Sequence, residues 1–237
     1  MHRSAHRVSR EQTLRWRGGW IRVRSWRGDD DVAYLAVGAD RPPPTEFVER
    51  CLETLREQGR LRVVTSALTP ADSLPFVDAG FSVRERLHLL AHDMTDVTAP
   101  TRPTRRARGA DHPAVLALDG LAFDDFWRLD EMGLDDAIRA TPVARFRVAG
   151  DDGIAAYAIS GRSGHQGYLQ RLAVAPSSRR EGWGRVVVSD GLHWLARHGV
   201  RRTLVNTQLD NASALALYEA CGFRRLAVGL CVLGRSL

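Results

Sequence analysis

Two glycines in a basic loop, Gly182 and Gly184, mark the strongest candidate for a ligand site in this sequence. They follow an apolar segment that ends at Val174, and an apolar helical segment begins directly after them. Glycine allows backbone N–H groups to turn toward a ligand, and a helix start adds unpaired donors and the positive end of its dipole. Because Arg179 and Arg180 add positive charge, the loop predicts a phosphate or pyrophosphate site.

The loop does not fit the common nucleotide-binding motifs. A dinucleotide fingerprint requires a third glycine where Val187 stands. A Walker A loop requires a lysine on the phosphates, and all 34 basic residues of this chain are arginine. The lack of lysine also excludes lysine-linked pyridoxal phosphate and Schiff-base aldol chemistry.

Metal binding is not expected either. The spacing of His88 and His92 in a strand-like segment separates them by about 13 Å, too far for one metal ion. The three cysteines, Cys51, Cys221 and Cys231, include no Cys-x-x-Cys pair and are odd in number, which argues against a zinc ribbon or a disulfide framework.

The pattern of apolar residues predicts the elements that position the loop. Alternation predicts strands and a period of 3.6 predicts helices. In the second half of the chain the predicted strands are 145–148, 154–160, 168–174, 201–207 and 226–233, and the predicted helices are 111–123, 124–140, 186–197 and 211–221. In the first half we expect strands at 20–26, 33–38 and 83–92 and a helix at 46–58, with Pro70 and Pro75 breaking up a further helix.

A second motif begins about thirty residues beyond the loop, in the predicted helix 211–221. Its positions are Asn211, Ala214, Leu217, Tyr218, Gly222 and Phe223. Together with Arg-x-x-Gly-x-Gly directly after a Leu-Ala-Val-x-Pro strand, it resembles the GCN5-related N-acetyltransferase (GNAT) family. The resemblance covers about Arg105 to Leu233.

The resemblance implies an α+β domain of the GNAT fold, with a central mixed, largely antiparallel sheet flanked by helices. It implies acetyl-CoA as donor and a small-molecule or peptide amine as acceptor, with direct attack by the amine. In the matching positions, loop amides would hold the pyrophosphate, the strand edge would pair with the pantetheine amides, and Asn211 would reach the coenzyme arm. These candidate coenzyme-binding residues are Leu172, Ala173, Val174, Arg179, Arg180, Glu181, Gly182, Trp183, Gly184, Arg185 and Asn211.

Two residues are candidates for catalysis. The resemblance places Tyr218 near the thioester sulfur, and a hydroxyl of pKa about 10 can donate a proton or hydrogen bond to a thiolate whose thiol has a pKa of about 8.5. Many family members carry a Glu on the strand before the loop, whereas strand 168–172 here has no carboxylate. Gln170 is therefore the candidate for positioning a water, and a carboxylate from 124–131 is the alternative.

Three hypotheses about function follow. The leading one is an acetyl-CoA-dependent N-acetyltransferase whose acceptor is a protein N-terminus, a polyamine, an aminoglycoside or an aminated thiol precursor. A non-enzymatic acyl-CoA sensor is the alternative, because the strand carboxylate is missing. Nucleic-acid binding is the least favoured, and it rests on the eight arginines of 1–27.

An internal repeat suggests a tandem organisation. Leu35-Ala36-Val37, a helix ending near Gly59 and a closing Gly80-Phe81 echo the second half, but Pro42, Pro43 and Pro44 replace its glycines. Proline offers no N–H to an anion, so the first copy reads as a degenerate scaffold. We expect a basic arm at 1–19 that need not be ordered, a degenerate GNAT-like half at 20–98 and a catalytic GNAT acetyltransferase domain at 99–237.

Composition limits the class of protein. The 237 residues are 44% hydrophobic and 26% charged, which is typical of a globular protein with a substantial core. No apolar run reaches the roughly 20 residues that a membrane span needs, and the basic N-terminus lacks the apolar stretch of a signal peptide. We expect a cytoplasmic monomer or homodimer without membrane partners.

Overall fold

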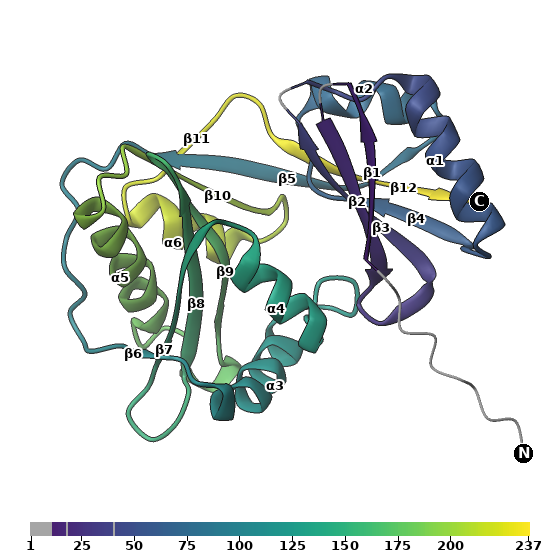
Figure 1. Cartoon of the computed structure of the whole chain (residues 1–237). Coiled ribbons are helices and arrows are strands. Elements are labelled where there is room, and N and C mark those ends of the chain that lie inside the picture. The colour runs from purple at the N-terminus through teal and green to yellow at the C-terminus, as the bar shows by residue number, and fades with distance from the viewer. Residues whose placement is uncertain (1–10, 18, 40) are drawn as a thin grey trace, which may run out of the picture. The chain divides into compact units, whose positions relative to one another are not determined.

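The computed structural model describes residues 11–17, 19–39 and 41–237, which form two compact units (Figure 1). The chain up to Leu87 and the segment Val228–Leu237 make the first unit, and His88–Ala227 makes the second. The last segment of the chain therefore belongs with the first unit. The sequence predicts a boundary between residues 98 and 99, whereas in the structure the chain passes from one unit to the other after Leu87 and again before Val228. Local patterning could not indicate the second of these boundaries, because it carries no information about which strands residues 228–237 pair with.

The first unit is a mixed sheet with two helices. Its strands, in spatial order, are β1 (Gln12–Trp16), β2 (Gly19–Trp26), β3 (Asp29–Ala39), β4 (Arg62–Thr65), β12 (Leu230–Ser236) and the first part of β5 (Ser82–His92). β3 and β4 are parallel, and the other pairs are antiparallel. β12 is hydrogen-bonded between β4 and β5, so the unit's sheet needs the last residues of the chain.

The core of the first unit lies between its sheet and the helices α1 (Thr45–Glu57) and α2 (Pro70–Asp78). α1 buries Val48, Leu52 and Leu55, whose spacing of three and four residues places them on one face. They pack in one cluster with Leu35 of β3 and Leu233 of β12.

Two predictions for the first half were wrong. Residues 12–16 of the expected arm form β1, which pairs with β2 because Leu14 and Trp16 pack against the core; residues 1–10 lie outside the described residues. Pro70 and Pro75 do not prevent helix α2. Pro70 stands in its first turn, where an N–H needs no partner, and complete burial of Phe76 offsets the bond lost at Pro75.

The second unit contains the candidate site. Its strands, in spatial order, are the end of β5, β10 (Arg202–Gln208), β9 (Gln166–Val174), β8 (Ala156–Ser163), β7 (Val143–Ala149) and the short β6 (Arg105–Arg106). β6 to β9 are antiparallel neighbours, whereas β9 and β10 are parallel. β11 (Arg224–Arg225) pairs with the end of β5. The mixed, largely antiparallel sheet of the prediction is confirmed.

Helices cover both faces of this sheet. α5 (Trp183–Arg197) lies on one side of β7, β8 and β9, and α3 (His112–Ala122) and α4 (Glu131–Arg139) lie on the other (Figure 1). α6 (Ala212–Ala220) packs with α5 around a cluster that contains Tyr218. The predicted helix 124–140 is too long, because 124–130 is a loop and α4 begins at Glu131. Short 3-10 turns precede α3 (Gly109–Asp111) and α5 (Pro176–Ser178).

Both units contain the same strand-helix-strand-helix order. In the first, β3, α1, β4 and α2 follow in order with β3 parallel to β4, and in the second β9, α5, β10 and α6 do the same. A tandem origin for this shared order remains a prediction. No helix in the described residues is long and apolar enough to cross a membrane.

Substitution of Leu233 tests the role of the last strand. Leu233 is fully buried in the core of the first unit, so Leu233→Ala should reduce the free energy of unfolding by about 2–5 kcal/mol. Urea denaturation measures the loss. Leu61→Ala is the control, because Leu61 is 57% exposed and its loss should change stability by less than about 0.5 kcal/mol. Equal effects of the two variants would contradict the placement of β12.

Candidate functional site

The loop between β9 and α5 presents unpaired backbone donors. Arg180 and Gly182 have positive φ angles of 67° and 88°, and the first hydrogen bond of α5 runs from the N–H of Val186 to the carbonyl of Gly182. Gly182 offers no side-chain cap, so the N–H groups of Trp183, Gly184 and Arg185 have no partner within the helix. This arrangement has the free backbone donors that the predicted anion site requires.

The two glycines of the loop have different roles. Gly182 starts the helix in the left-handed region, which other residues adopt at a cost. A Cβ on Gly182 would meet no atom within 4 Å, so the space beside it is open. A Cβ on Gly184 would lie 2.9 Å from the side chain of Leu217, so Gly184 allows α5 and α6 to approach closely.

The side chains of the loop divide into two groups. Arg179, Arg180 and Arg185 are exposed and make no ion pair within the described residues. Trp183 is instead buried in the core, where its ring nitrogen donates to Glu181 at 3.2 Å and Arg102 stacks over its ring. Trp183 and Glu181 therefore hold the loop in shape, and Trp183 can offer a ligand only its backbone N–H.

Strands β9 and β10 separate just before this loop. Their pairing covers Gln166 to Tyr168 against Arg202 to Leu204, yet β9 continues to Val174 and β10 to Gln208. Beyond Tyr168 the edge of β9 that faces β10 has no strand partner among the described residues. Its backbone groups are available to a ligand that carries amides.

The register of β9 shows which residues present this edge. The N–H of Ala175 donates to Ala155, on the side of β8. Backbone groups alternate along a strand, so Ala173 also faces β8, while Leu172 and Val174 face the opening. The backbone of Ala173 is turned to β8 and its side chain is buried on the α3 side, so these contacts add no support to the prediction that Ala173 binds the coenzyme.

A β-bulge lies at Gln170. Arg171 pairs with Ile159 and Leu169 with Ser160, so Gln170 has no partner in β8. Its Nε2 donates to Thr141 Oγ1 at 3.2 Å, whereas its Oε1 is buried without a hydrogen-bond partner among the described atoms. A buried acceptor of this kind usually binds water or a ligand.

Comparisons with known proteins agree with this geometry. Residues 114–223 match the sequence model described as the acetyltransferase (GNAT) family. A tandem GNAT protein from the clavulanic acid biosynthesis pathway superposes with a TM-score of 0.67 at 13% identity, over 92% of this chain and 79% of that chain. The second unit has the GNAT fold.

Curated relatives carry acetyltransferase names. The chain is 32% identical to a mycothiol acetyltransferase from Thermomonospora curvata over 193 residues, which are 75% of this chain and 65% of that protein. It is 32% identical to the ribosomal protein bS18 alanine N-acetyltransferase of Salmonella typhimurium over 35% of this chain and 55% of that protein. The chain thus spans less than two thirds of the length of these relatives.

In this unit with the GNAT fold, Tyr218 is buried on α6. Its ring packs with Leu169, Val188 and Phe223, and its hydroxyl makes no hydrogen bond within the described residues. Burial raises the pKa of Tyr218 to about 12, although the positive charge of Arg171 opposes the rise. The hydroxyl therefore stays protonated at neutral pH and is able to donate a proton or a hydrogen bond.

Asn211 caps α6. Its Oδ1 accepts a hydrogen bond from the N–H of Ala214 at 3.0 Å, as expected of an N-cap residue. The side-chain oxygen of Asn211 is therefore committed to the helix, and only its Nδ2 group remains for a ligand.

A buried ion pair behind β9 was missed by the sequence analysis. Asp119 of α3 is fully buried and accepts two hydrogen bonds of 2.8 Å from Arg171, and Tyr157 donates to the same carboxylate. Arg171 also donates to the carbonyl of Trp127 and lies over the ring of Phe123. A single aspartate within the apolar run of α3 is the one sequence signal for such a pair.

This ion pair organises the loop between α3 and α4. Asp119 accepts from the N–H of Leu129 at 2.6 Å, so both ends of the pair hold loop backbone. The carboxylates of the loop serve local structure: Asp124 accepts from two N–H groups, Asp130 caps α4, and Asp125 pairs with Arg128. The predicted carboxylate base from 124–131 gains no support from these contacts. Among the described residues, no group of three or more His, Cys, Asp or Glu could hold a metal ion.

Loss of Arg171 should leave a buried carboxylate unpaired. Arg171→Met is expected to lower the free energy of unfolding by about 3–5 kcal/mol, because Asp119 cannot reach water. Arg128→Met is the matched control, since the Arg128–Asp125 pair is exposed and should contribute at most about 1 kcal/mol. Thermal or urea unfolding of both variants measures the difference. A loss below about 1 kcal/mol in Arg171→Met would contradict the role given to the pair.

Proposed function

We propose that this chain is an N-acetyltransferase that moves the acetyl group of acetyl-CoA to a primary amine by direct attack. The observation that carries the proposal is the opening between β9 and β10, which leads directly to the anion-binding loop before α5. An acyl-CoA has the matching chemistry, because amides of its pantetheine arm precede a pyrophosphate. The family match and the acetyltransferase names of the relatives support the same activity.

Each part of acetyl-CoA would meet a different segment of this chain. The N–H groups of Trp183, Gly184 and Arg185 would bind the pyrophosphate, with Arg179 and Arg180 adding charge, and the outward backbone groups of Leu172 and Val174 would bind the pantetheine amides. Acetyl-CoA supplies a thioester carbon that an amine can attack.

Tyr218 would act as the proton donor. A thiolate leaves the thioester, and a hydroxyl that remains protonated to about pH 12 can stabilise or protonate it. The apolar surroundings of Tyr218 strengthen such a hydrogen bond, because they exclude competing water.

Gln170 would act on the acceptor side. Its unpartnered Oε1 can accept a hydrogen bond from the incoming amine or from a water that takes the amine's proton. An amide is a poor base, so Gln170 orients these groups and the proton leaves to solvent. Amines that are already neutral at the working pH should therefore react fastest.

The acceptor is an amine on a small molecule or a peptide. Two relatives support this range of acceptors by their names, mycothiol acetyltransferase and ribosomal protein bS18 alanine N-acetyltransferase. We further propose that the first unit is a degenerate GNAT half that serves as scaffold. The helix that corresponds to α5 there begins after Pro44, without a side-chain cap, where prolines replace the glycines.

Binding of acetyl-CoA is the first test. Calorimetric titration of the whole chain should give a dissociation constant in the micromolar range, and Gly182→Ala should weaken binding about tenfold, because an L-residue at φ 88° distorts the donors. Gly120→Ala is the control, since Gly120 has ordinary φ and open space. Absence of binding in wild-type protein would end the proposal.

Replacement of Tyr218 tests the chemistry. Tyr218→Phe should lower kcat by about 10²–10⁴-fold, the range of general acid catalysis, while the affinity for acetyl-CoA changes little. In wild-type enzyme kcat should rise with pH up to about pH 10, because the amine loses its proton while Tyr218 keeps its own until about pH 12. Steady-state assays with an amine and peptide panel measure both.

The same panel separates the enzyme from the sensor hypothesis. A sensor would bind acetyl-CoA tightly and yield no acetylated product by mass spectrometry. An unchanged kcat in Tyr218→Phe would instead remove Tyr218 from the mechanism.

A further inference from the structure

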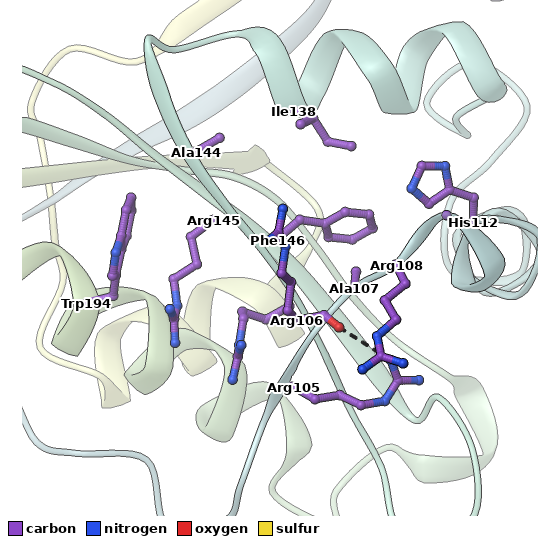
Figure 2. A pocket seen from close by; sticks show the side chains of 12 residues that line it. Arg105, Arg106, Ala107, Arg108, His112, Ile138, Ala144, Arg145, Phe146 and Trp194 are labelled. Carbon is purple, nitrogen blue, oxygen red and sulfur yellow. Dashed lines mark hydrogen bonds between the residues drawn. The ribbon is translucent and has the colours of Figure 1, made fainter.

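A broad basic groove lies along β6 and β7, at the end of the second unit's sheet. Its volume is about 820 Å³, within the range of ligand-binding sites. Figure 2 shows its side chains, which include Phe146, Trp194 and His112. The lining contains no carboxylate and five arginines, namely Arg105, Arg106, Arg108, Arg145 and Arg147.

Most of the positive charge of the groove is not neutralised. Arg105 forms two hydrogen bonds of 2.7 Å with Asp111, and Arg145 and Arg147 share the single carboxylate of Asp190. Arg106 and Arg108 are exposed, and neither guanidinium makes an ion pair in the described part of the chain. The groove therefore favours an anionic partner.

The floor of the groove is an unpaired strand edge. β6 contains only two residues and pairs with Arg147 and Val148, and one further bond joins the N–H of Ala107 to the carbonyl of Phe146. Backbone groups two residues apart point to the same side, so the N–H and carbonyl of Ala144 point outward as well. No hydrogen bond to either group occurs within the described residues, and Ala144 lines the groove.

The two walls beside this edge differ in character. Arg145 and Arg147 extend toward α5, where Trp194 and Asp190 lie. Phe146 extends to the opposite face, where its ring contacts His112 and Tyr157 and Ile138 packs nearby. A strand placed along β7 would thus have a cationic wall on one face and a largely apolar wall on the other.

We propose that this groove binds an extended peptide segment with alternating acidic and apolar residues, which adds as a strand to the edge of β7. The acidic side chains would meet Arg106, Arg145 and Arg147, and the apolar ones would meet Phe146 and Ile138. Main-chain hydrogen bonds to Ala144 would supply affinity, as in other strand additions.

Other occupants fit less well. A second copy of this chain that pairs along β7 would bring the same arginines against one another, which is repulsive. A nucleic acid or free phosphate could use the charge but not the edge of Ala144 or the apolar wall. The groove also lies apart from the coenzyme loop, because Trp194 stands about 16 Å along α5 from Trp183 at 1.5 Å per residue.

Fluorescence anisotropy of the whole chain with a labelled heptapeptide of alternating Glu and Leu tests the proposal. The reversal of two charges in Arg106→Glu/Arg108→Glu should weaken binding at least about tenfold. Ala144→Pro should weaken it about fivefold, the value of one hydrogen bond, and leaves the ladder to β8 intact since only an outward N–H is lost. Arg201→Glu, an exposed arginine outside the groove, should have less than about twofold effect.

Three competitors separate the alternatives. A block peptide of the same composition should compete poorly, and a single-stranded oligonucleotide and inorganic pyrophosphate should compete more weakly than the alternating peptide. Hydrogen exchange at the amide of Ala144 should slow when the peptide binds. Stronger competition by the oligonucleotide or pyrophosphate, equal binding of the block peptide, or no binding at all would each overturn the proposal.

Discussion

The separation of two parallel strands is the constraint on which the candidate site depends. β9 and β10 are paired at their first residues and then diverge, although both continue as strands. Unpaired strand edges inside a domain are costly unless water or a ligand satisfies them. The loop that follows β9 leads to the first turn of α5, where further backbone N–H groups have no partner within the helix. The proposed coenzyme site combines these two sets of backbone groups.

A buried ion pair joins β9 to α3 and to the loop before α4. The bulge at Gln170 puts two consecutive residues, Gln170 and Arg171, on the face of α3 and α4. Arg171 is then held by Asp119, and the pair fixes the backbone of the loop at Trp127 and Leu129. Gln170 is left with a buried, unpartnered oxygen beside this rigid support. A positioned polar atom at the base of a site is typical of catalytic surroundings.

The second unit's sheet leaves strand backbone unpaired in two places, the interior opening between β9 and β10 and the outer edge at β7. The opening beside β9 offers neutral backbone donors that end in a helix dipole. The edge of β7 offers backbone groups between a cationic and an apolar wall. Both are places where a strand ladder stops early, at Tyr168 in one case and at the two-residue β6 in the other. Both proposed recognition surfaces thus lie where strand pairing is incomplete.

Local patterns were enough to predict the glycine-containing loop before α5 and the helix that carries Tyr218, because glycine placement, capping and periodicity act within a few residues, whereas the mixed sheet was predicted from the family resemblance. Only the tertiary structure decided the features that join distant residues. Arg171 and Asp119 are 52 positions apart, and their pairing follows from the bulge at Gln170, which shifts the strand's alternation by one residue. β12 likewise lies between β4 and β5, more than a hundred residues away in sequence. Hydrogen-bond partners across a sheet depend on the order of its strands, which the spacing of residues within one segment does not predict.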